Sequence, residues 1–182
     1  MIIVSGPCGA GKTTVGRLVA AAFELSAHIQ ADHFMPFVVN GWDGPWPESE
    51  QQNDVIGAAI GAAALEFAVG GYTVVLDGHM FPEGVEGLAQ WSERRGVALH
   101  YAVLRPDLAT CLARAEQRRP GDPQDLESFT RVHARFDDLA DREVNVLEAT
   151  GTPDEVAADV LAAFSSGGLR VRGPGVRVDG RG

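Results

Sequence analysis

The stretch GPCGAGKTT at residues 6–14 constrains the fold of this chain more than any other feature. The apolar residues at 2–4 before it are typical of a short buried strand. After it, apolar residues recur at the spacing of one helix face: Val15, Leu18, Val19 and Ala22. We therefore expect the chain to pass from a strand through a tight glycine-rich turn into a helix that begins at Lys12.

Lys12 is the only lysine among the fifteen basic residues of the chain. It belongs to the pattern Gly-x4-Gly-Lys-Thr of the phosphate-binding P-loop, with a strand before and a helix after it, as that motif requires. Glycines let the backbone N–H groups turn toward a phosphate, and the start of the helix adds partial positive charge. The planar fork of an arginine is broader than the slim stem of a lysine, so a geometric requirement explains the single lysine.

The P-loop predicts a nucleoside triphosphate with Mg²⁺, and the hydroxyl of Thr13 is a predicted magnesium ligand. The residues predicted to bind the phosphates are Gly6, Pro7, Cys8, Gly9, Ala10, Gly11, Lys12, Thr13 and Thr14.

Strand and helix patterns alternate along the rest of the chain, which predicts an α/β fold with a parallel sheet covered on both faces. The expected strands lie at 28–32, 72–76, 97–104 and 144–147. The expected helices lie at 53–69, 83–95, 107–119 and 126–142, and a last one starts at 152. A loop rich in proline, glycine and tryptophan is expected at 36–49.

The length of 182 residues suits one domain, which we expect at residues 1–166. The composition then changes to a glycine- and arginine-rich tail at 167–182. The tail either pairs with itself as a hairpin or stays disordered, and its glycine content favours disorder.

The net charge of −10 argues against a binder of nucleic acid, which needs a clustered basic surface. No apolar run reaches the ~20 residues that span a bilayer, and no signal peptide is evident at the start. The two cysteines, Cys8 and Cys111, lie far apart in sequence and form no disulfide framework. We expect a cytoplasmic protein whose partner is a small molecule, without nucleic acid or membrane.

Two large classes of P-loop protein are disfavoured by missing motifs. A GTPase reads guanine with Asn-Lys-x-Asp, and the chain has no second lysine for it. A transporter ATPase needs Leu-Ser-Gly-Gly-Gln, and the nearest stretch is Ser-Ser-Gly-Gly at 165–168. A compact phosphoryl-transfer enzyme remains.

Over residues 1–165 the chain resembles the small P-loop kinases of the nucleoside monophosphate kinase fold, in particular the shikimate kinase, gluconate kinase and chloramphenicol phosphotransferase-like branch. Five stretches carry the resemblance: GPCGAGKTT, IQADHF, VVLDGH, LARAEQRRPGD and EATGTPDE. It implies a three-layer fold with a five-stranded parallel sheet in the order 2-3-1-4-5. It also implies ATP over the P-loop and an acceptor beneath a small lid at about 118–126. Shikimate kinases carry Gly-Gly-Gly after the third strand, whereas this chain has Asp77-Gly78-His79, which disfavours shikimate.

Two aspartates follow strands at the edge where open α/β sheets bind ligands. We predict that Asp32 orients and deprotonates the acceptor hydroxyl, as the matching aspartate does in the antibiotic-kinase branch; a turn or helix-capping role is the alternative. Asp77 closes an apolar strand, and we predict that it binds Mg²⁺ or contacts the acceptor.

Arginines flank the predicted lid, where they can stabilise phosphate charge once the lid closes. Arg118 and Arg119 are predicted catalytic residues, and Arg114 is predicted to lie near the base; a solvated helix end is the alternative for all three. By resemblance, the turn at Gly151 lines the adenine, although a simple helix-capping turn explains it nearly as well.

Three further residues are candidates for the acceptor site. His33 and His79 follow the two aspartates, although a structural role is the commoner one for such histidines. Trp42 could wall an aromatic acceptor or seal the edge of the core. The segment at 34–42 is more apolar than a polyol or acidic sugar requires.

These features predict an ATP- and Mg²⁺-dependent kinase that phosphorylates a hydroxyl of a small organic molecule, with an antibiotic-like metabolite as the favoured acceptor. The alternatives are a sugar-acid or nucleoside/nucleotide kinase, and a non-catalytic nucleotide-binding switch.

The role of Lys12 can be tested directly. We expect Lys12→Ala to abolish turnover and leave the fold intact, because the lysine contributes charge at the phosphates and no core packing. Turnover of ATP and the circular dichroism spectrum of the variant measure the two effects. A variant that keeps its turnover would contradict the assignment of the P-loop.

Overall fold

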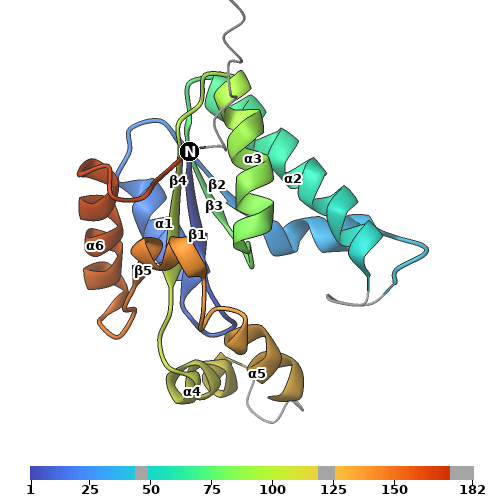
Figure 1. Ribbon diagram of the computed structural model, residues 1–182, viewed down its shortest axis with the longest axis vertical. Helices are drawn as coiled ribbons and strands as arrows, with labels where there is room; N and C mark the ends of the chain where they lie inside the picture. The colour runs from blue at the N-terminus through green and yellow to red at the C-terminus, as the bar shows by residue number, and fades with distance from the viewer. Residues whose placement is uncertain (44–48, 119–125, 173–182) are drawn as a thin grey trace, which may run out of the picture.

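A central sheet lies between two layers of helices in the computed structural model, which describes residues 1–43, 49–118 and 126–172 (Figure 1). Within these ranges the sheet has the order β2–β3–β1–β4–β5, with β6 paired to β4. The strands are β1 (Ile2–Ser5), β2 (Ser26–Gln30), β3 (Thr73–Asp77), β4 (Leu99–Leu104), β5 (Val146–Leu147) and β6 (Arg170–Val171). The predicted parallel order 2-3-1-4-5 is confirmed.

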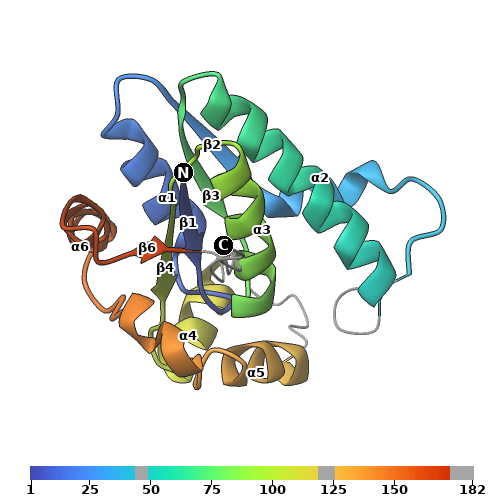
Figure 2. The same ribbon diagram turned by 45° about the horizontal axis from the view of Figure 1, so that its top comes forward.

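The helices divide between the two faces of the sheet and its carboxyl edge. The α-helices are α1 (Lys12–Ala21), α2 (Glu50–Val69), α3 (Pro82–Arg94), α4 (Leu108–Arg118), α5 (Leu126–Ala134) and α6 (Pro153–Ser165). Two 3₁₀-helices, η1 (Ala31–Phe37) and η2 (Ala140–Asn145), complete the described elements. Helices α1 and α6 cover one face and α2 and α3 the other, while α4 and α5 lie beyond the strand ends (Figures 1 and 2). In the described ranges, no helix is both long and apolar enough to cross a membrane.

The core follows from the alternation of side chains along the strands. Ile2 and Val4 point into the cluster under α1 and α6, whereas Ile3 points into the cluster under α2 and α3. All three are fully buried. A parallel strand buried on both faces has to be apolar at successive positions, which is why β1 is an unbroken apolar run.

The second strand and the segment after it differ from the expected bounds. The strand was expected at 28–32, but β2 ends at Gln30, and η1 takes up the residues that follow. Asp32 therefore lies in the first turn of a 3₁₀-helix, two residues beyond the strand end. Pro36 lies inside this short helix and donates no backbone hydrogen bond to it.

The helix predicted at 126–142 is wrong in its second half. Helix α5 ends at Ala134, although Phe136 and Leu139 are buried as the apolar pattern requires. The guanidinium of Arg105 donates to the carbonyl oxygens of Phe136 (2.8 Å) and Asp137 (3.3 Å). These carbonyls would otherwise accept from the next helical turn, so a distant arginine replaces the continuation of the helix.

The beginning of the predicted tail belongs to the sheet. Residue pairs Val171–Leu99 and Arg170–His100 join β6 to β4 in antiparallel register. Leu169 and Val171 are 2% and 3% exposed, so they are core residues, whereas residues 173–182 lie outside the described ranges.

Strand β6 pairs with β4 because β5 is too short to cover that edge of the sheet. Its two residues pair only with Val103 and Leu104, at the carboxyl end of β4. The other half of that edge would expose unpaired backbone groups, and the N–H of Tyr101 instead donates to the carbonyl of Leu169 at 2.8 Å. The folded part of the chain therefore extends beyond residue 166.

The contribution of this segment can be measured by substitution. We expect Leu169→Ala to lower the free energy of unfolding by about 2–4 kcal/mol, because a fully buried side chain leaves a cavity. The exposed neighbour provides the control, since Arg170→Ala should change it by less than about 0.5 kcal/mol. Urea unfolding measures both, and equal effects would show that Leu169 is not part of the core.

Candidate nucleotide and acceptor site

The loop between β1 and α1 requires glycine at two positions. Gly6 has a φ of +139°, and a Cβ there would lie 2.1 Å from the carbonyl oxygen of Leu104. Gly9 has a φ of +78°, and a Cβ there would lie 2.2 Å from the carbonyl oxygen of Cys111. The loop is therefore packed against the end of β4 and against α4, where any side chain would displace it.

The start of α1 and its lysine form a site suited to an anion. The N-cap residue is Gly11, which has no side chain to accept from the first-turn N–H groups. These groups and the helix dipole are suited to a phosphate. The ammonium of Lys12 folds back over the loop and donates to the carbonyl oxygen of Pro7 at 2.8 Å. The predicted phosphate-binding residues 6–14 thus form one continuous loop and helix start.

Asp77 connects the P-loop helix to the sheet. Its carboxylate is almost fully buried, with 4% of the residue exposed. The hydroxyl of Thr13 donates to its Oδ1 at 2.9 Å, and Nε2 of His28 lies 2.6 Å from its Oδ2. The structure thus brings together the two predicted magnesium ligands, Thr13 and Asp77. A hydroxyl beside a carboxylate is an oxygen donor set that fits Mg²⁺.

Asp32 lies in a very different environment from Asp77. In strand register Gln30 pairs with Asp77, so the turn that carries Asp32 begins beside the end of β3. Asp32 and the adjacent His33 are both exposed. Within the described ranges the Asp32 carboxylate makes no hydrogen bond or ion pair, so no structural role accounts for it there.

His79 lies against the P-loop. Its Nδ1 is 2.9 Å from the carbonyl oxygen of Gly6, which can only accept, so Nδ1 carries the ring proton. Its Nε2 is then an acceptor 3.4 Å from the sulfur of Cys8. Contact of His79 with an acceptor molecule stays a prediction.

The charge state of His79 follows from the same surroundings. His79 is an exposed residue, but its ring lies against the P-loop. Desolvation of the ring, followed by the positive charge of Lys12, lowers the pKa of His79 to about 3, although its bond to Gly6 opposes the shift. The ring is therefore neutral at pH 7.

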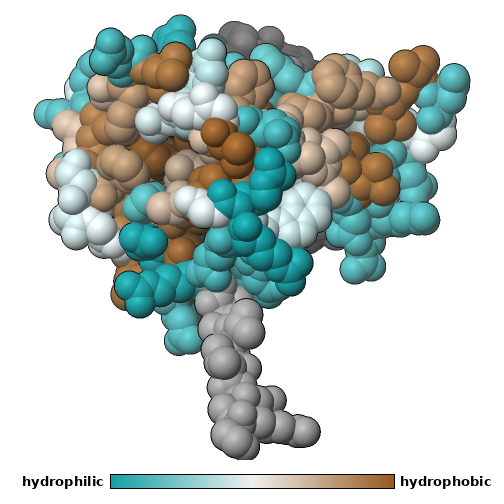
Figure 3. All heavy atoms as spheres, turned by 90° about the horizontal axis from the view of Figure 1, so that it is seen from above, coloured by the Kyte–Doolittle hydropathy of each residue, from teal (hydrophilic) through white to brown (hydrophobic). Residues whose placement is uncertain are grey.

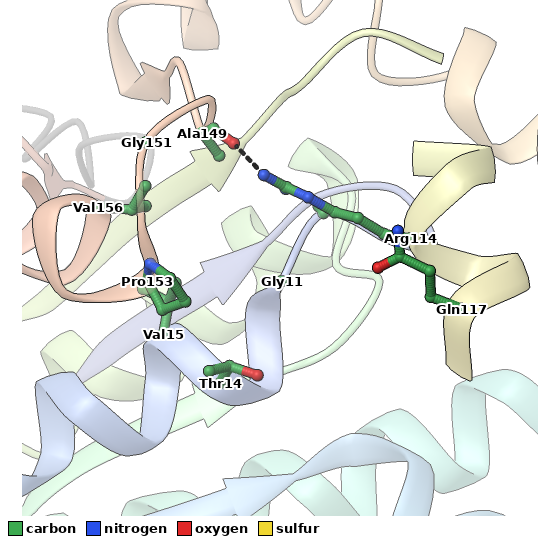
Figure 4. Close-up of a pocket in the computed structure, with 10 residues that line it drawn as sticks. Gly11, Thr14, Val15, Arg114, Gln117, Ala149, Gly151, Pro153 and Val156 are labelled. Atoms are coloured by element: carbon green, nitrogen blue, oxygen red, sulfur yellow. Dashed lines mark hydrogen bonds between the residues drawn. The ribbon is translucent and has the colours of Figure 1, made fainter. Parts of the chain in front are cut away.

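An open groove of about 260 Å³ lies beside the P-loop. Its lining includes Ala10, Gly11 and Thr14 from the P-loop, Arg114 and Gln117 from α4, and Gly151 and Pro153 from the turn before α6. Arg114 reaches across the groove and donates to the carbonyl oxygen of Ala149 at 3.1 Å (Figure 4). The structure therefore brings Arg114 and Gly151, two predicted nucleotide contacts, to one surface next to the P-loop.

The turn that contains Gly151 is also a regular helix cap. Thr152 accepts from the N–H of Glu155, and the Glu155 carboxylate accepts from the N–H of Thr152. This capping box explains the sequence of the turn without a ligand. Contact of the turn with adenine stays a prediction.

The structure places the remaining predicted site residues only in part. Arg118 ends α4, but its side chain is outside the description, as are Arg119 and most of the predicted lid. Trp42 is 46% exposed, so it does not seal the core.

Two residues near the site were not singled out by the sequence. Gln117 lines the groove, and His28 bonds to Asp77. A polar residue within a predicted strand was the only signal for His28.

A P-loop, a hydroxyl–carboxylate pair and a neighbouring groove on a sheet of this order define a P-loop nucleotide-binding protein. The chain belongs to the AAA domain family (AAA_18), whose sequence profile matches residues 2–133. The match spans the P-loop, both aspartates and α4. No curated protein is significantly similar to the chain in sequence.

The solved structures that share the fold include two small kinases and an antibiotic resistance protein. A sugar kinase from Janibacter sp. HTCC2649 has a TM-score of 0.68 and 20% identity, over 90% of this chain and 93% of that chain. A gluconokinase from Sinorhizobium meliloti 1021 has a TM-score of 0.66 and 21% identity, over 91% of both chains. The tunicamycin resistance protein of Deinococcus radiodurans has a TM-score of 0.64 and 19% identity, over 90% of this chain and 94% of that chain. The predicted resemblance to this branch of small P-loop kinases is confirmed at the level of the fold.

The position of Cys8 makes it a probe of the P-loop. We expect iodoacetamide to modify Cys8 and to block nucleotide binding, because its thiol lies beside the start of a helix. Burial raises the pKa of the Cys111 thiol to about 11, so Cys111 should not react. Mass spectrometry and nucleotide titration measure the two effects.

Bound nucleotide should protect Cys8 from modification. Cys8→Ser is the control, since it should bind nucleotide before and after the same treatment. Alkylated Cys8 with unchanged nucleotide affinity would contradict the expectation.

Proposed function

We propose that the protein is an ATP- and Mg²⁺-dependent phosphotransferase that transfers the γ-phosphoryl group to a hydroxyl of a small organic molecule. The observation that carries this proposal is the contrast between two carboxylates at one sheet edge. Asp77 is buried and bonded to Thr13, whereas Asp32 is exposed and has no bonded partner in the described ranges. A nucleotide switch needs the first carboxylate and has no need of the second.

Each residue has a definite task in this reaction. Lys12 and the N–H groups at the start of α1 bind and neutralise the phosphates. Thr13 and Asp77 would hold Mg²⁺, which supplies further positive charge to the phosphates. Asp32 accepts the proton of the acceptor hydroxyl and orients its oxygen. Arg118 and Arg119, at a lid of about 118–126, stabilise phosphate charge when the lid closes, and Arg114 lies near the base.

The acceptor side of the site favours a molecule with an apolar body. Phe37, Val39 and Trp42 follow Asp32 in the chain and are 74%, 84% and 46% exposed. In the view from above, apolar side chains lie among polar ones over the right-hand part of the molecule, which contains α2 (Figure 3). Exposed apolar surface beside a site is typical of a surface that a ligand covers. His33, Trp42 and His79 are the proposed contacts of this acceptor.

An antibiotic-like metabolite is therefore our leading acceptor, in line with the tunicamycin resistance protein among the similar folds. A sugar acid is the second candidate, because a gluconokinase and a sugar kinase share the fold equally well. A small-molecule acceptor is also consistent with the acidic net charge, and we place the reaction in the cytoplasm.

The proposal is tested by incubating the protein with ATP, Mg²⁺ and a panel of hydroxylated antibiotics, nucleosides, polyols and sugar acids. Mass spectrometry should detect one compound that gains a phosphate. Nucleotide binding without phosphate transfer to any compound would favour the switch.

A variant of Asp32 tests the proposed mechanism more directly than the compound panel does. We expect Asp32→Asn to lower turnover by about a hundredfold or more and to leave ATP affinity within about twofold, because Asp32 acts on the acceptor. Asp54→Asn, at an exposed position of α2, is the matched control with unchanged turnover. Equal loss of turnover and of ATP affinity would remove Asp32 from the role of base.

A further inference from the structure

His28 comes from β2 and reaches the site from beneath α1. In strand register it pairs with Val75, while Gln30 pairs with Asp77. Residues two apart on a strand point to the same face, so His28 and Asp77 are diagonal neighbours on the face that α1 covers. His28 is therefore placed behind the carboxylate, on the side away from the P-loop turn.

The contact between the two residues has a defined direction. Nε2 of His28 lies 2.6 Å from Oδ2 of Asp77. An ionised carboxylate can only accept, so Nε2 carries a proton and donates. The other oxygen, Oδ1, accepts from the Thr13 hydroxyl at 2.9 Å. Donors from two separate elements therefore hold both oxygens of Asp77.

Gly16 shows that α1 is fitted to this pair. It lies one helical turn after Thr13, and a Cβ there would come within 3.0 Å of His28 Nε2 and 3.6 Å of Asp77 Cβ. A contact of 3.0 Å is too short to be accommodated without movement of the imidazole ring. Glycine at this position thus lets the helix lie directly on the histidine and carboxylate.

From this geometry we propose that His28 is a positioning residue. It holds the Asp77 carboxylate in the orientation that accepts the Thr13 hydroxyl, and so sets the gain in nucleotide affinity that Mg²⁺ provides. While the Thr13 hydroxyl donates its hydrogen bond to Asp77, the lone pairs of its oxygen are directed away from Asp77 and are available to a cation. The inference rests on the proposed function, which assigns Mg²⁺ to Thr13 and Asp77.

A carboxylate held by Thr13 alone can rotate and share that bond with water. Removing a partner that orients a metal ligand typically costs about ten- to a hundredfold in metal affinity. The loss should appear only when the metal is present, because His28 has no contact with the P-loop turn among the described interactions.

The experiment measures binding of a non-hydrolysable ATP analogue by calorimetry, once with MgCl₂ and once with EDTA. The affinity ratio of the two conditions is the magnesium effect. His28→Leu removes the donor at similar volume, and we expect it to reduce this ratio about tenfold, with the EDTA affinity unchanged.

Two matched variants separate positioning from simple packing. The amide nitrogen of glutamine is as many bonds from the backbone as Nε2 of histidine, so His28→Gln should restore most of the magnesium effect. Gly16→Ala pushes against the ring and should reduce the ratio while His28 is present. In a His28→Leu background, where no ring remains to displace, Gly16→Ala should have no further effect.

Several results would overturn the inference. They are a wild-type protein without a magnesium effect, equal losses with MgCl₂ and EDTA, and a glutamine variant that behaves as the leucine variant. If His28→Leu does not fold, a folded Gly16→Ala variant with an unchanged ratio overturns it as well. No acceptor is present in these titrations, so a failure to find phosphate transfer would count against the kinase and not against His28.

Discussion

The hydrogen bond between Thr13 and Asp77 joins the helix after the P-loop to the third strand, and the geometry of the site depends on it. The bond crosses from α1 to β3 and joins an exposed threonine to a carboxylate that is almost fully buried. A buried carboxylate is tolerated only when its oxygens are bonded, and Thr13 and His28 together meet this condition. Three elements, β2, β3 and α1, thus have their relative positions set by one charged group.

The Thr13–Asp77 pair lies between the two sides of the proposed site, the nucleotide side and the acceptor side. On the α1 and α6 side, the groove lined by Arg114 and Gly151 is suited to the rest of a nucleotide. On the η1 and α2 side, the exposed carboxylate of Asp32 precedes a run of exposed apolar side chains. The P-loop lies between the two. An ATP molecule with its base in the groove would therefore direct its terminal phosphate toward the acceptor side.

Prediction from sequence succeeded where a motif carries its own geometry. The loop at residues 6–14 allows few conformations, because Gly6 and Gly9 are packed against neighbouring carbonyls and the lysine must reach back over the turn. Asp77 was expected near the P-loop, because a polar residue that ends an apolar parallel strand lies at the carboxyl edge of the sheet, where ligands bind. Prediction failed where a distant residue decides the local structure. The guanidinium of Arg105 donates to a carbonyl that would otherwise accept from a continuation of α5. Val171 pairs with β4 because β5 is too short to cover that edge.

By itself, the sequence determined the alternation of strands and helices, the P-loop and the two carboxylates, because hydrophobic periodicity and glycine spacing are local properties of the chain. Only the tertiary structure decided which of these groups meet. His28 is separated from Asp77 by 49 positions, and Arg114 from Ala149 by 35. Their contacts arise from strand register and helix packing, which bring together residues that no local pattern relates. The sequence therefore predicted the parts of the candidate site, and only the folded structure showed how these parts are arranged.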